Sequence, residues 1–317
     1  MRTAVYRKVA LWCAVGAACA LAACGTDAND IDISDVDLSS FQVSISVDGQ
    51  GAPGAVRAGV TAIDENGDAV KLREDEIRIF ESKDRKEWVE VEFTTQRRES
   101  AQIPISAAVA MDYSGSMSQE QQNDAEDAVV AFSEYLMTGD RMAIIKFANR
   151  VKIMQEFTDD KGVIEDAVKS NDLDGFQLGT AVWDAAKKGV DLAEDERAPK
   201  CVVVTSDGED NMSDTKASEL IDDAVKAGVP IFSLGFSENP DSDGLKYLYK
   251  VSEETGGLFW TFQNTGQMEG MYKSIADAFD DALVATWPSS FDGGTVYVKV
   301  EVDADAGEKS ATSAYGF

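Results

Sequence analysis

Three oxygen-bearing side chains follow an apolar segment near the middle of the chain at intervals of two residues: Asp112, Ser114 and Ser116. The apolar run before them, 105–111, has the length of a buried strand, and the residues after them have the pattern of a helix. A carboxylate and two hydroxyls in a tight turn at a strand's carboxyl end are hard ligands of the kind that divalent cations bind. The spacing alone is weakly specific, because short motifs of this kind also arise by chance.

Two later residues also carry side-chain oxygens and also lie at the end of a predicted strand or the start of a predicted helix. Thr180 precedes an amphipathic segment that begins at Ala181, and Asp207 directly follows the apolar run 201–206. Both apolar runs are continuous, as is typical of buried parallel strands. In a doubly wound sheet the carboxyl ends of neighbouring strands share one edge, where ligands bind. The sequence therefore predicts that five side chains meet at that edge: Asp112, Ser114, Ser116, Thr180 and Asp207.

The order of these motifs resembles that of the von Willebrand factor type A (VWA) domain. The resemblance extends over about 103–285 and consists of D-x-S-G-S, a threonine before a helix, and an Asp-Gly pair that ends an apolar strand. It implies an α/β fold with a doubly wound, mostly parallel, Rossmann-like sheet. Ser206 stands where threonine is usual, and a single glycine, Gly179, stands where a pair is common. Neither departure removes a ligand.

The resemblance also implies a metal-ion-dependent adhesion site, or MIDAS. In similar domains the residues that correspond to Ser114, Ser116 and Thr180 bind Mg²⁺ or Mn²⁺ directly. Those that correspond to Asp112 and Asp207 act largely through water. One coordination position is left for an Asp or Glu carboxylate from a partner protein. The sequence does not decide between Mg²⁺, Mn²⁺ and Ca²⁺.

The amino-terminal residues indicate export. Arg2, Arg7 and Lys8 precede an apolar segment, 9–23, that is short for a membrane-spanning helix and is typical of a signal peptide. The segment ends in Leu-Ala-Ala-Cys24, which resembles the bacterial lipobox and implies cleavage before Cys24 and lipidation of that residue. An ordinary signal peptide with a cysteine near its cleavage site is the alternative.

A lipidated Cys24 predicts a protein of the bacterial cell envelope that is held on the membrane only by its lipid. No aspartate directly follows Cys24. In bacteria with two membranes that use this retention rule, we therefore expect the protein at the outer membrane.

The domain organisation follows from composition and periodicity. We expect a signal peptide over 1–23 and an acidic, disordered tether over 24–40, because the latter is rich in aspartate and lacks sustained periodicity. The VWA domain is expected over 103–286. Its last helix is predicted near 267–285, where apolar side chains recur on one stripe.

Segments on both sides of the VWA domain alternate apolar and polar residues, as half-buried antiparallel strands do. The pattern covers much of 41–102 and returns in 287–317, where Val296, Val298, Val300 and Val302 alternate with polar residues. We expect the two segments to form one antiparallel β-sandwich that holds or flanks the VWA domain. Two unrelated β extensions are the alternative.

Composition excludes several kinds of catalysis. The chain has no histidine, which rules out Ser-His-Asp and Cys-His catalysis and histidine-ligated zinc. Cys201 begins an apolar strand and is expected to be a buried core residue. An Mg²⁺-dependent phosphatase with Asp112 as nucleophile is the enzymatic alternative. Such enzymes usually place a second acid two residues later, where this chain has Ser114.

We therefore expect a non-enzymatic protein that binds a partner protein through its metal site. Its net charge of −29 disfavours nucleic acid as a partner. An envelope-assembly scaffold that uses the metal only for stability is the other alternative.

Overall fold

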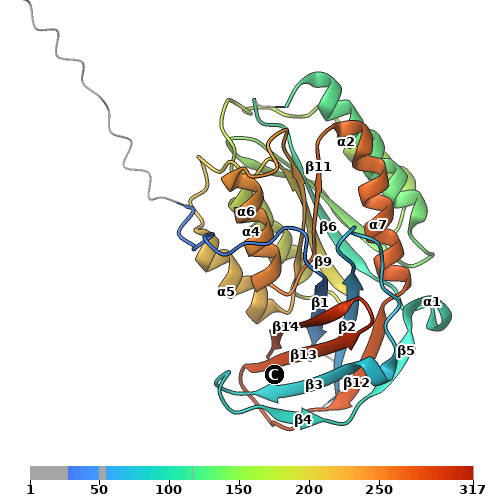
Figure 1. Ribbon diagram of the computed structural model, residues 1–317. Coiled ribbons are helices and arrows are strands. Elements are labelled where there is room, and N and C mark those ends of the chain that lie inside the picture. Colours follow the sequence, from blue (N-terminus) through green and yellow to red (C-terminus); the bar gives the residue numbers. More distant parts are fainter. Residues whose placement is uncertain (1–27, 50–54, 116, 317) are drawn as a thin grey trace, which may run out of the picture.

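The computed structural model describes residues 28–49, 55–115 and 117–316, which form two layered units (Figure 1). One unit is a six-stranded sheet with helices on both faces. The other consists of two four-stranded antiparallel sheets that share a hydrophobic core. The predicted fold class, a doubly wound α/β unit joined to an antiparallel β-sandwich, is confirmed.

The sheet of the α/β unit has the strand order β11-β10-β9-β6-β7-β8. Neighbouring strands are parallel except β7 and β8, which form an antiparallel hairpin around Asn149 and Arg150. β6 and β9 are buried along their whole length, which explains why their sequences are continuously apolar instead of alternating. The strands are β6 (Ser106–Asp112), β7 (Arg141–Phe147), β8 (Val151–Thr158), β9 (Lys200–Ser206), β10 (Ile231–Phe236) and β11 (Phe259–Phe262).

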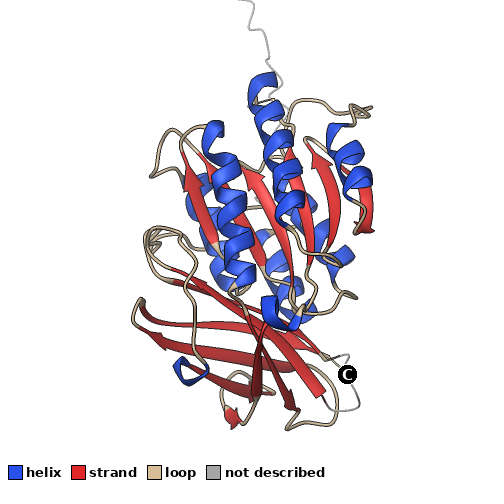
Figure 2. Cartoon of the chain, turned by 90° about the vertical axis from the view of Figure 1, so that its right-hand side faces the viewer, coloured by secondary structure: helices blue, strands red, loops and turns tan. Residues whose placement is uncertain are grey.

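Helices cover both faces of this sheet (Figure 2). One face carries α2 (Gln119–Tyr135), α3 (Lys161–Lys169) and α7 (Met268–Asp280), which share one apolar core. The other carries α4 (Val182–Ala193), α5 (Ala217–Ala227) and α6 (Asp243–Glu254), which share another. Helix α2 begins with a capping box, in which Ser118 and Gln121 satisfy each other's backbone N–H groups. Within the described ranges, no helix is long and apolar enough to span a membrane.

The β-sandwich combines strands from both sides of the α/β unit. One sheet has the order β1-β2-β12-β5 and the other β14-β13-β3-β4. Val296, Val298, Val300 and Val302 are all buried in the core between the sheets, as their alternation predicts. The strands are β1 (Gln42–Asp48), β2 (Ala55–Ile63), β3 (Ile77–Ser82), β4 (Val89–Val91), β5 (Thr94–Arg97), β12 (Leu283–Pro288), β13 (Val296–Ala304) and β14 (Gly307–Tyr315). The short helices η1 (Glu74–Glu76), α1 (Arg98–Ala101) and η2 (Thr265–Gln267) lie in the connections.

The last helix is shorter than its sequence pattern predicts. α7 ends at Asp280, and residues 283–288 form β12 instead of a further helical turn. Leu283 lies opposite Val60 of β2 on one side and Arg97 of β5 on the other. Pairing with two strands distant in sequence outweighs the local helical periodicity here, so the predicted boundary at 286 falls within a strand of the sandwich.

The prediction of a disordered tether over 24–40 is wrong for its described part, residues 28–40, which we call the strap. The strap runs along α5 and α6 before it enters β1 (Figure 1). Ala28 is buried, and Ile31, Val36 and Leu38 pack against the core beneath these helices. An acidic segment without contacts would stay disordered because ordering it costs conformational entropy. Here the apolar contacts and several hydrogen bonds offset that cost. Residues 24–27 lie outside the described residues.

Candidate metal site

Asp112 is the last residue of β6 and lies at the carboxyl edge of the parallel sheet. Beyond it the chain turns sharply: the Tyr113 N–H donates to the Phe147 carbonyl of β7 at 2.7 Å, and the Ser114 N–H donates to Asp112 Oδ1 at 2.7 Å. The side chain of Asp112 thus fixes the turn that holds Ser114. Both residues are buried, and Asp112 is only 3% exposed.

The second oxygen of Asp112 binds the neighbouring strand. Ser206, the last residue of β9, donates its hydroxyl to Asp112 Oδ2 at 2.9 Å and accepts the Gly208 N–H at 3.1 Å. Burial raises the pKa of Asp112 to about 6; the charge of nearby Asp207 acts in the same direction, and the hydrogen bonds from Ser114 and Ser206 oppose it. Asp112 and Asp207 therefore lie close enough to interact as like charges.

Asp207 begins the loop after β9 and is partly exposed. Its Oδ1 accepts the Glu209 N–H at 3.1 Å. The next residue, Gly208, has a φ of +79°, and a Cβ there would lie 2.2 Å from the Gly244 carbonyl oxygen. Only glycine fits this turn, which explains the Asp-Gly pair that follows the strand.

Thr180 reaches the same edge from the loop before α4. Its N–H donates to Asn211 Oδ1 at 2.9 Å, and its carbonyl accepts the Asn211 N–H at 3.0 Å. The next residue, Ala181, donates its N–H to the Ala148 carbonyl beyond β7 at 2.8 Å. Thr180 is thereby held between the ends of β7 and β9, and it is 5% exposed.

The structure thus brings four of the five predicted residues to one sheet edge: Asp112, Ser114, Thr180 and Asp207. Ser116, the fifth, and the predicted lipidation site Cys24 lie outside the described residues. In the described part of the chain, no three His, Cys, Asp or Glu side chains are grouped closely enough to hold a metal ion. The candidate site instead combines two carboxylates with hydroxyls, a set of hard oxygen donors that suits Mg²⁺, Mn²⁺ or Ca²⁺.

Sequence patterns did not identify the residues that support this edge. Asp210 accepts the backbone N–H of Trp183 at 3.1 Å and the hydroxyl of Ser213 at 2.6 Å, and burial raises its pKa. Helix α4 has no side-chain cap of its own at Ala181, so Asp210 caps it from another loop. Asp210 lies 27 positions from Trp183 in the sequence. Sequence rules for helix caps consider only neighbouring residues, so they could not identify it.

A buried ion pair supports the turn from below. The Tyr113 hydroxyl donates to Glu126 of α2 at 2.6 Å, and Lys146 of β7 lies 3.4 Å from the same carboxylate. The Lys146 ammonium also lies 4.4 Å from the Tyr113 ring centroid. Burial lowers the pKa of Lys146 and raises that of Tyr113. Together these contacts tie the Asp112–Ser114 turn to helix α2.

Comparisons with known proteins found similar chains. Human inter-alpha-trypsin inhibitor heavy chain H3 is 21% identical over 206 residues, which is 59% of this chain and 23% of that protein. The chain thus spans about a quarter of the length of the curated relatives it matches. Among solved structures, a von Willebrand factor type A protein from Catenulispora acidiphila is 12% identical with a TM-score of 0.48, covering 89% of this chain and 75% of that one.

A second solved structure is proximal thread matrix protein 1 from the mussel byssus with a zinc-occupied MIDAS motif. It is 17% identical with a TM-score of 0.46, and the match covers 58% of this chain and 47% of that one. The family model of the von Willebrand factor type A domain matches residues 108–274, more than half of the 317 residues. The chain therefore belongs to the VWA domain family.

Proposed function

We propose that this protein is a lipid-anchored component of the bacterial cell envelope that binds a partner protein through a divalent cation. Ser114, Ser116 and Thr180 hold the ion directly, and Asp112 and Asp207 hold it through water. The ion is Mg²⁺, Mn²⁺ or Ca²⁺. An Asp or Glu carboxylate of the partner completes its coordination.

The observation that carries this proposal is the engagement of both carboxylate oxygens of Asp112. One accepts the Ser114 N–H and the other the Ser206 hydroxyl. A carboxylate oriented toward the protein in this way favours contact with the ion through water. The direct donors are then neutral hydroxyls, which leave the positive charge of the ion uncompensated. Such an ion attracts an external carboxylate, and binding the partner needs no catalytic group.

The same hydrogen bonds argue against the phosphatase alternative. A nucleophilic carboxylate attacks through an oxygen lone pair, and each oxygen of Asp112 accepts a hydrogen bond from the protein, which lowers its nucleophilicity. Ser114 stands where a general acid would be needed, and a hydroxyl is a weak acid. Partner binding is therefore the better-supported function.

Calorimetric titration of Mg²⁺ and of Mn²⁺ tests the metal site. We expect uptake by the wild type and its loss in Thr180→Ala, because a direct ligand is removed. Thr138→Ala is the matched control, since Thr138 is exposed in the loop before β7, at the opposite edge of the sheet. Wild-type protein that takes up neither ion would refute the proposal.

Capture of partner proteins from the native cell envelope distinguishes metal-dependent partner binding from a scaffold role in which the metal is only structural. We expect a partner that the wild type retains in Mg²⁺ and loses in EDTA, and that Thr180→Ala does not retain. A partner retained equally under all three conditions would instead support a scaffold with a structural metal.

Lipid anchoring is tested by mass spectrometry of the mature amino terminus and by Cys24→Ala. Because acylation of both sulfur and nitrogen gives stable membrane binding, the variant should leave the membrane fraction or remain as uncleaved precursor. An unacylated mature terminus would exclude the anchor.

A further inference from the structure

The beginning of the strap caps a helix of the α/β unit. Helix α5 lacks a side-chain cap at Lys216. The strap satisfies its first N–H groups: Ala217 donates to the Ala28 carbonyl at 2.8 Å, and Ser218 donates to Asp30 Oδ1 at 3.0 Å. The Ser218 hydroxyl also donates to Asp30 Oδ2 at 2.7 Å. Because unsatisfied helix ends are costly, these bonds hold the strap in place.

The strap residue between these two lies beside the metal site. Asn29 Oδ1 accepts the indole N–H of Trp183 at 2.8 Å, and Trp183 is the third residue after Thr180. Asn29 also lines a hollow of about 640 Å³ together with residues of the loop that follows β9, Asp207 to Asn211. We call this loop, 207–211, the rim. The amino-terminal end of the strap therefore adjoins the rim.

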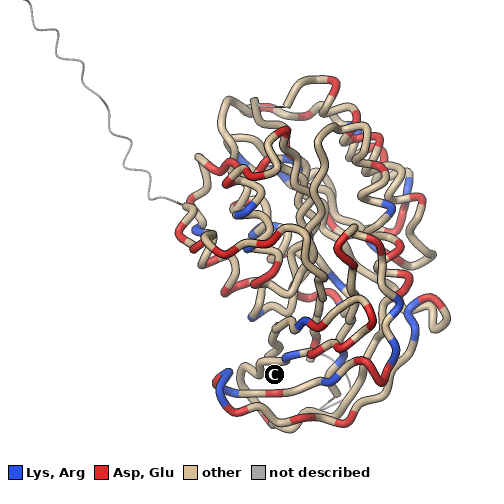
Figure 3. Tube along the Cα trace, viewed as in Figure 1, with Lys and Arg blue, Asp and Glu red and all other residues tan. Residues whose placement is uncertain are grey.

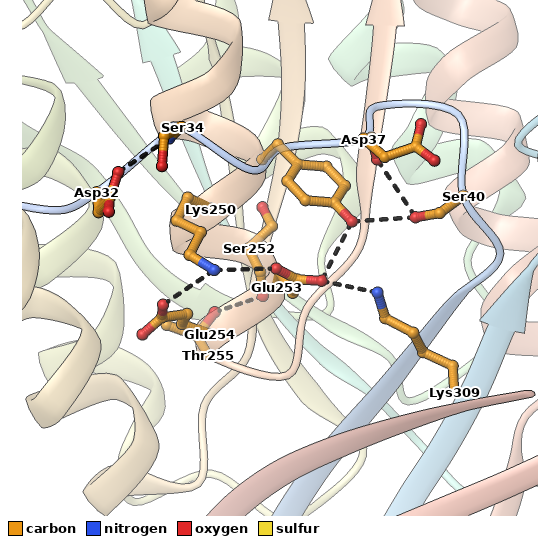
Figure 4. A network of polar contacts seen from close by, with 11 residues as sticks. Asp32, Ser34, Asp37, Ser40, Lys250, Ser252, Glu253, Glu254, Thr255 and Lys309 are labelled. Carbon is orange, nitrogen blue, oxygen red and sulfur yellow. Dashed lines mark hydrogen bonds and ion pairs between the residues drawn. The ribbon is translucent and has the colours of Figure 1, made fainter.

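The other end of the strap is fixed at the junction with the β-sandwich (Figure 4). The Ser40 hydroxyl lies 3.0 Å from that of Tyr249 on α6, and Tyr249 donates to Glu253 at 3.2 Å. Glu253 in turn accepts a hydrogen bond from Lys309 of β14 at 2.7 Å. With both ends bonded and its apolar residues packed between them, the strap is part of the folded body.

A docked strap limits how far the rim can lie from the membrane. Three residues lie between Cys24 and Ala28, so four Cα-to-Cα steps connect them, and a fully extended chain would span at most about 14 Å. A disordered segment over the whole of 24–40 would instead allow about 60 Å. We propose that the rim and its metal site face the membrane that holds Cys24, and that the partner carboxylate belongs to a protein at the surface of that same membrane. This inference rests on the proposed lipid anchoring.

Charge favours a protein over a lipid as the source of the carboxylate. No Lys or Arg of the described chain lines the hollow beside the rim. Five acidic residues do: Asp207, Glu209, Asp210, Glu238 and Asp243. Asp and Glu residues also occur at many other positions along the chain of the α/β unit (Figure 3). Anionic headgroups, including one that carries a carboxylate, are repelled by such a surface. A protein loop can place one carboxylate at the ion and keep basic side chains next to it.

Fluorescence quenching on vesicles tests the orientation. Full-length lipidated protein is labelled at Glu209→Cys on the rim or at Glu87→Cys beside β4, which Figure 1 shows at the end of the sandwich far from the helices. Cys201 is buried and its pKa is raised by burial, so an introduced surface cysteine reacts selectively. The vesicles are phosphatidylcholine with a nitroxide quencher on a fraction of the headgroups. We expect strong quenching at position 209 and weak quenching at position 87.

Variants of the strap supply the control. Asn29→Ala combined with Asp30→Ala removes the contacts to Trp183 and Ser218, and the difference between the two labels should disappear. Asp30→Asn is the milder change if the double variant does not fold. Asp35→Ala alters an exposed strap residue whose side chain makes no hydrogen bond to the described part of the chain, and it should preserve the difference. Equal quenching of the two labels on acylated wild-type protein would overturn the inference, whereas an unacylated terminus would overturn the proposed anchoring instead.

A photocrosslinker at position 209 in native membranes distinguishes the source of the carboxylate. An adduct of protein mass that is lost in EDTA supports a protein partner. An adduct of lipid mass assigns the site to a headgroup and refutes that part of the proposal.

Discussion

Ser206 donates its hydroxyl to Asp112 at 2.9 Å and so connects the ends of β9 and β6 within the candidate site. The same hydroxyl accepts the N–H of Gly208. The Ser206 side chain thus orients the Asp112 carboxylate at the end of β6 and also fixes the loop that follows β9. A threonine would keep both bonds, because it carries the same hydroxyl on the same carbon.

We expect Ser206→Ala to weaken Mg²⁺ binding by about 10- to 100-fold, as is common when a residue that orients a metal ligand is removed. Ser206→Thr should retain most of the affinity because the hydroxyl remains. Calorimetric titration of the two variants and the wild type measures this. Equal affinity in all three would show that the orientation of Asp112 does not depend on Ser206.

Two substitutions of Asp112 should affect stability in opposite directions in EDTA. Asp112→Ala leaves the Ser114 N–H and the Ser206 hydroxyl without their acceptor, and we expect a loss of about 1–3 kcal/mol in the free energy of unfolding. Asp112→Asn keeps an acceptor and removes a buried charge, so it should unfold at a higher urea concentration than the wild type. Neither variant should bind Mg²⁺. Urea denaturation and calorimetry together check this.

Asp140 should be far more important for stability than an exposed acid. It forms an ion pair with the buried Arg98 and accepts the N–H groups of Ile105 at 2.9 Å and Met137 at 2.8 Å. Asp140→Ala leaves the Arg98 charge without this buried partner, for which we expect a loss of about 3–5 kcal/mol. Asp277→Ala breaks an exposed pair with Lys273 and should cost less than about 1 kcal/mol. Similar losses in the two variants, measured by urea denaturation, would contradict this.

Because Lys200 is buried, we expect the free energy of unfolding to rise with pH in the alkaline range. Burial lowers its pKa to about 8 from 10.5, so between these values the unfolded chain binds more protons than the native one. Stability therefore increases from pH 8 to about pH 10.5, by on the order of 3 kcal/mol for this group. Below pH 8 the cost of the buried charge is present in full.

Other groups titrate in the same range, among them the buried thiol of Cys201, whose raised pKa acts in the opposite direction. The measurement is therefore the difference in unfolding free energy between wild type and Lys200→Met at several pH values. A difference that does not change with pH would refute the assignment.

Sequence patterns predicted the features that depend on local periodicity. The continuous apolar runs before Asp112 and Asp207 are central parallel strands, and alternating valines form the buried face of β13. The same runs place Asp112 and Asp207 at neighbouring strand ends, because strand order in a doubly wound sheet brings such ends together.

Features that depend on distant partners were not predicted. The residues from Leu283 onward continue a helical pattern, yet they pair with β2 and β5, which lie far away in sequence. The composition of the strap predicts disorder, yet Asp30 caps helix α5 at Ser218, which is 188 residues away in the sequence. Asp210 likewise caps a helix that precedes it. In each case a non-local hydrogen-bond partner decides the structure, and no window of sequence contains it.

The pairing of Leu283 with Arg97 has a consequence for how the chain reaches its native state. The two residues flank the α/β unit, so once that unit has folded its ends leave it side by side, already in register for β5 and β12. Pairing β5 with β12 then costs about as little loop-closure entropy as forming a short hairpin, because the folded α/β unit already holds the two ends together. Neither sheet can be completed earlier, because each needs strands from both sides. We therefore expect the VWA domain to fold first and the two sheets of the sandwich to assemble on it afterwards.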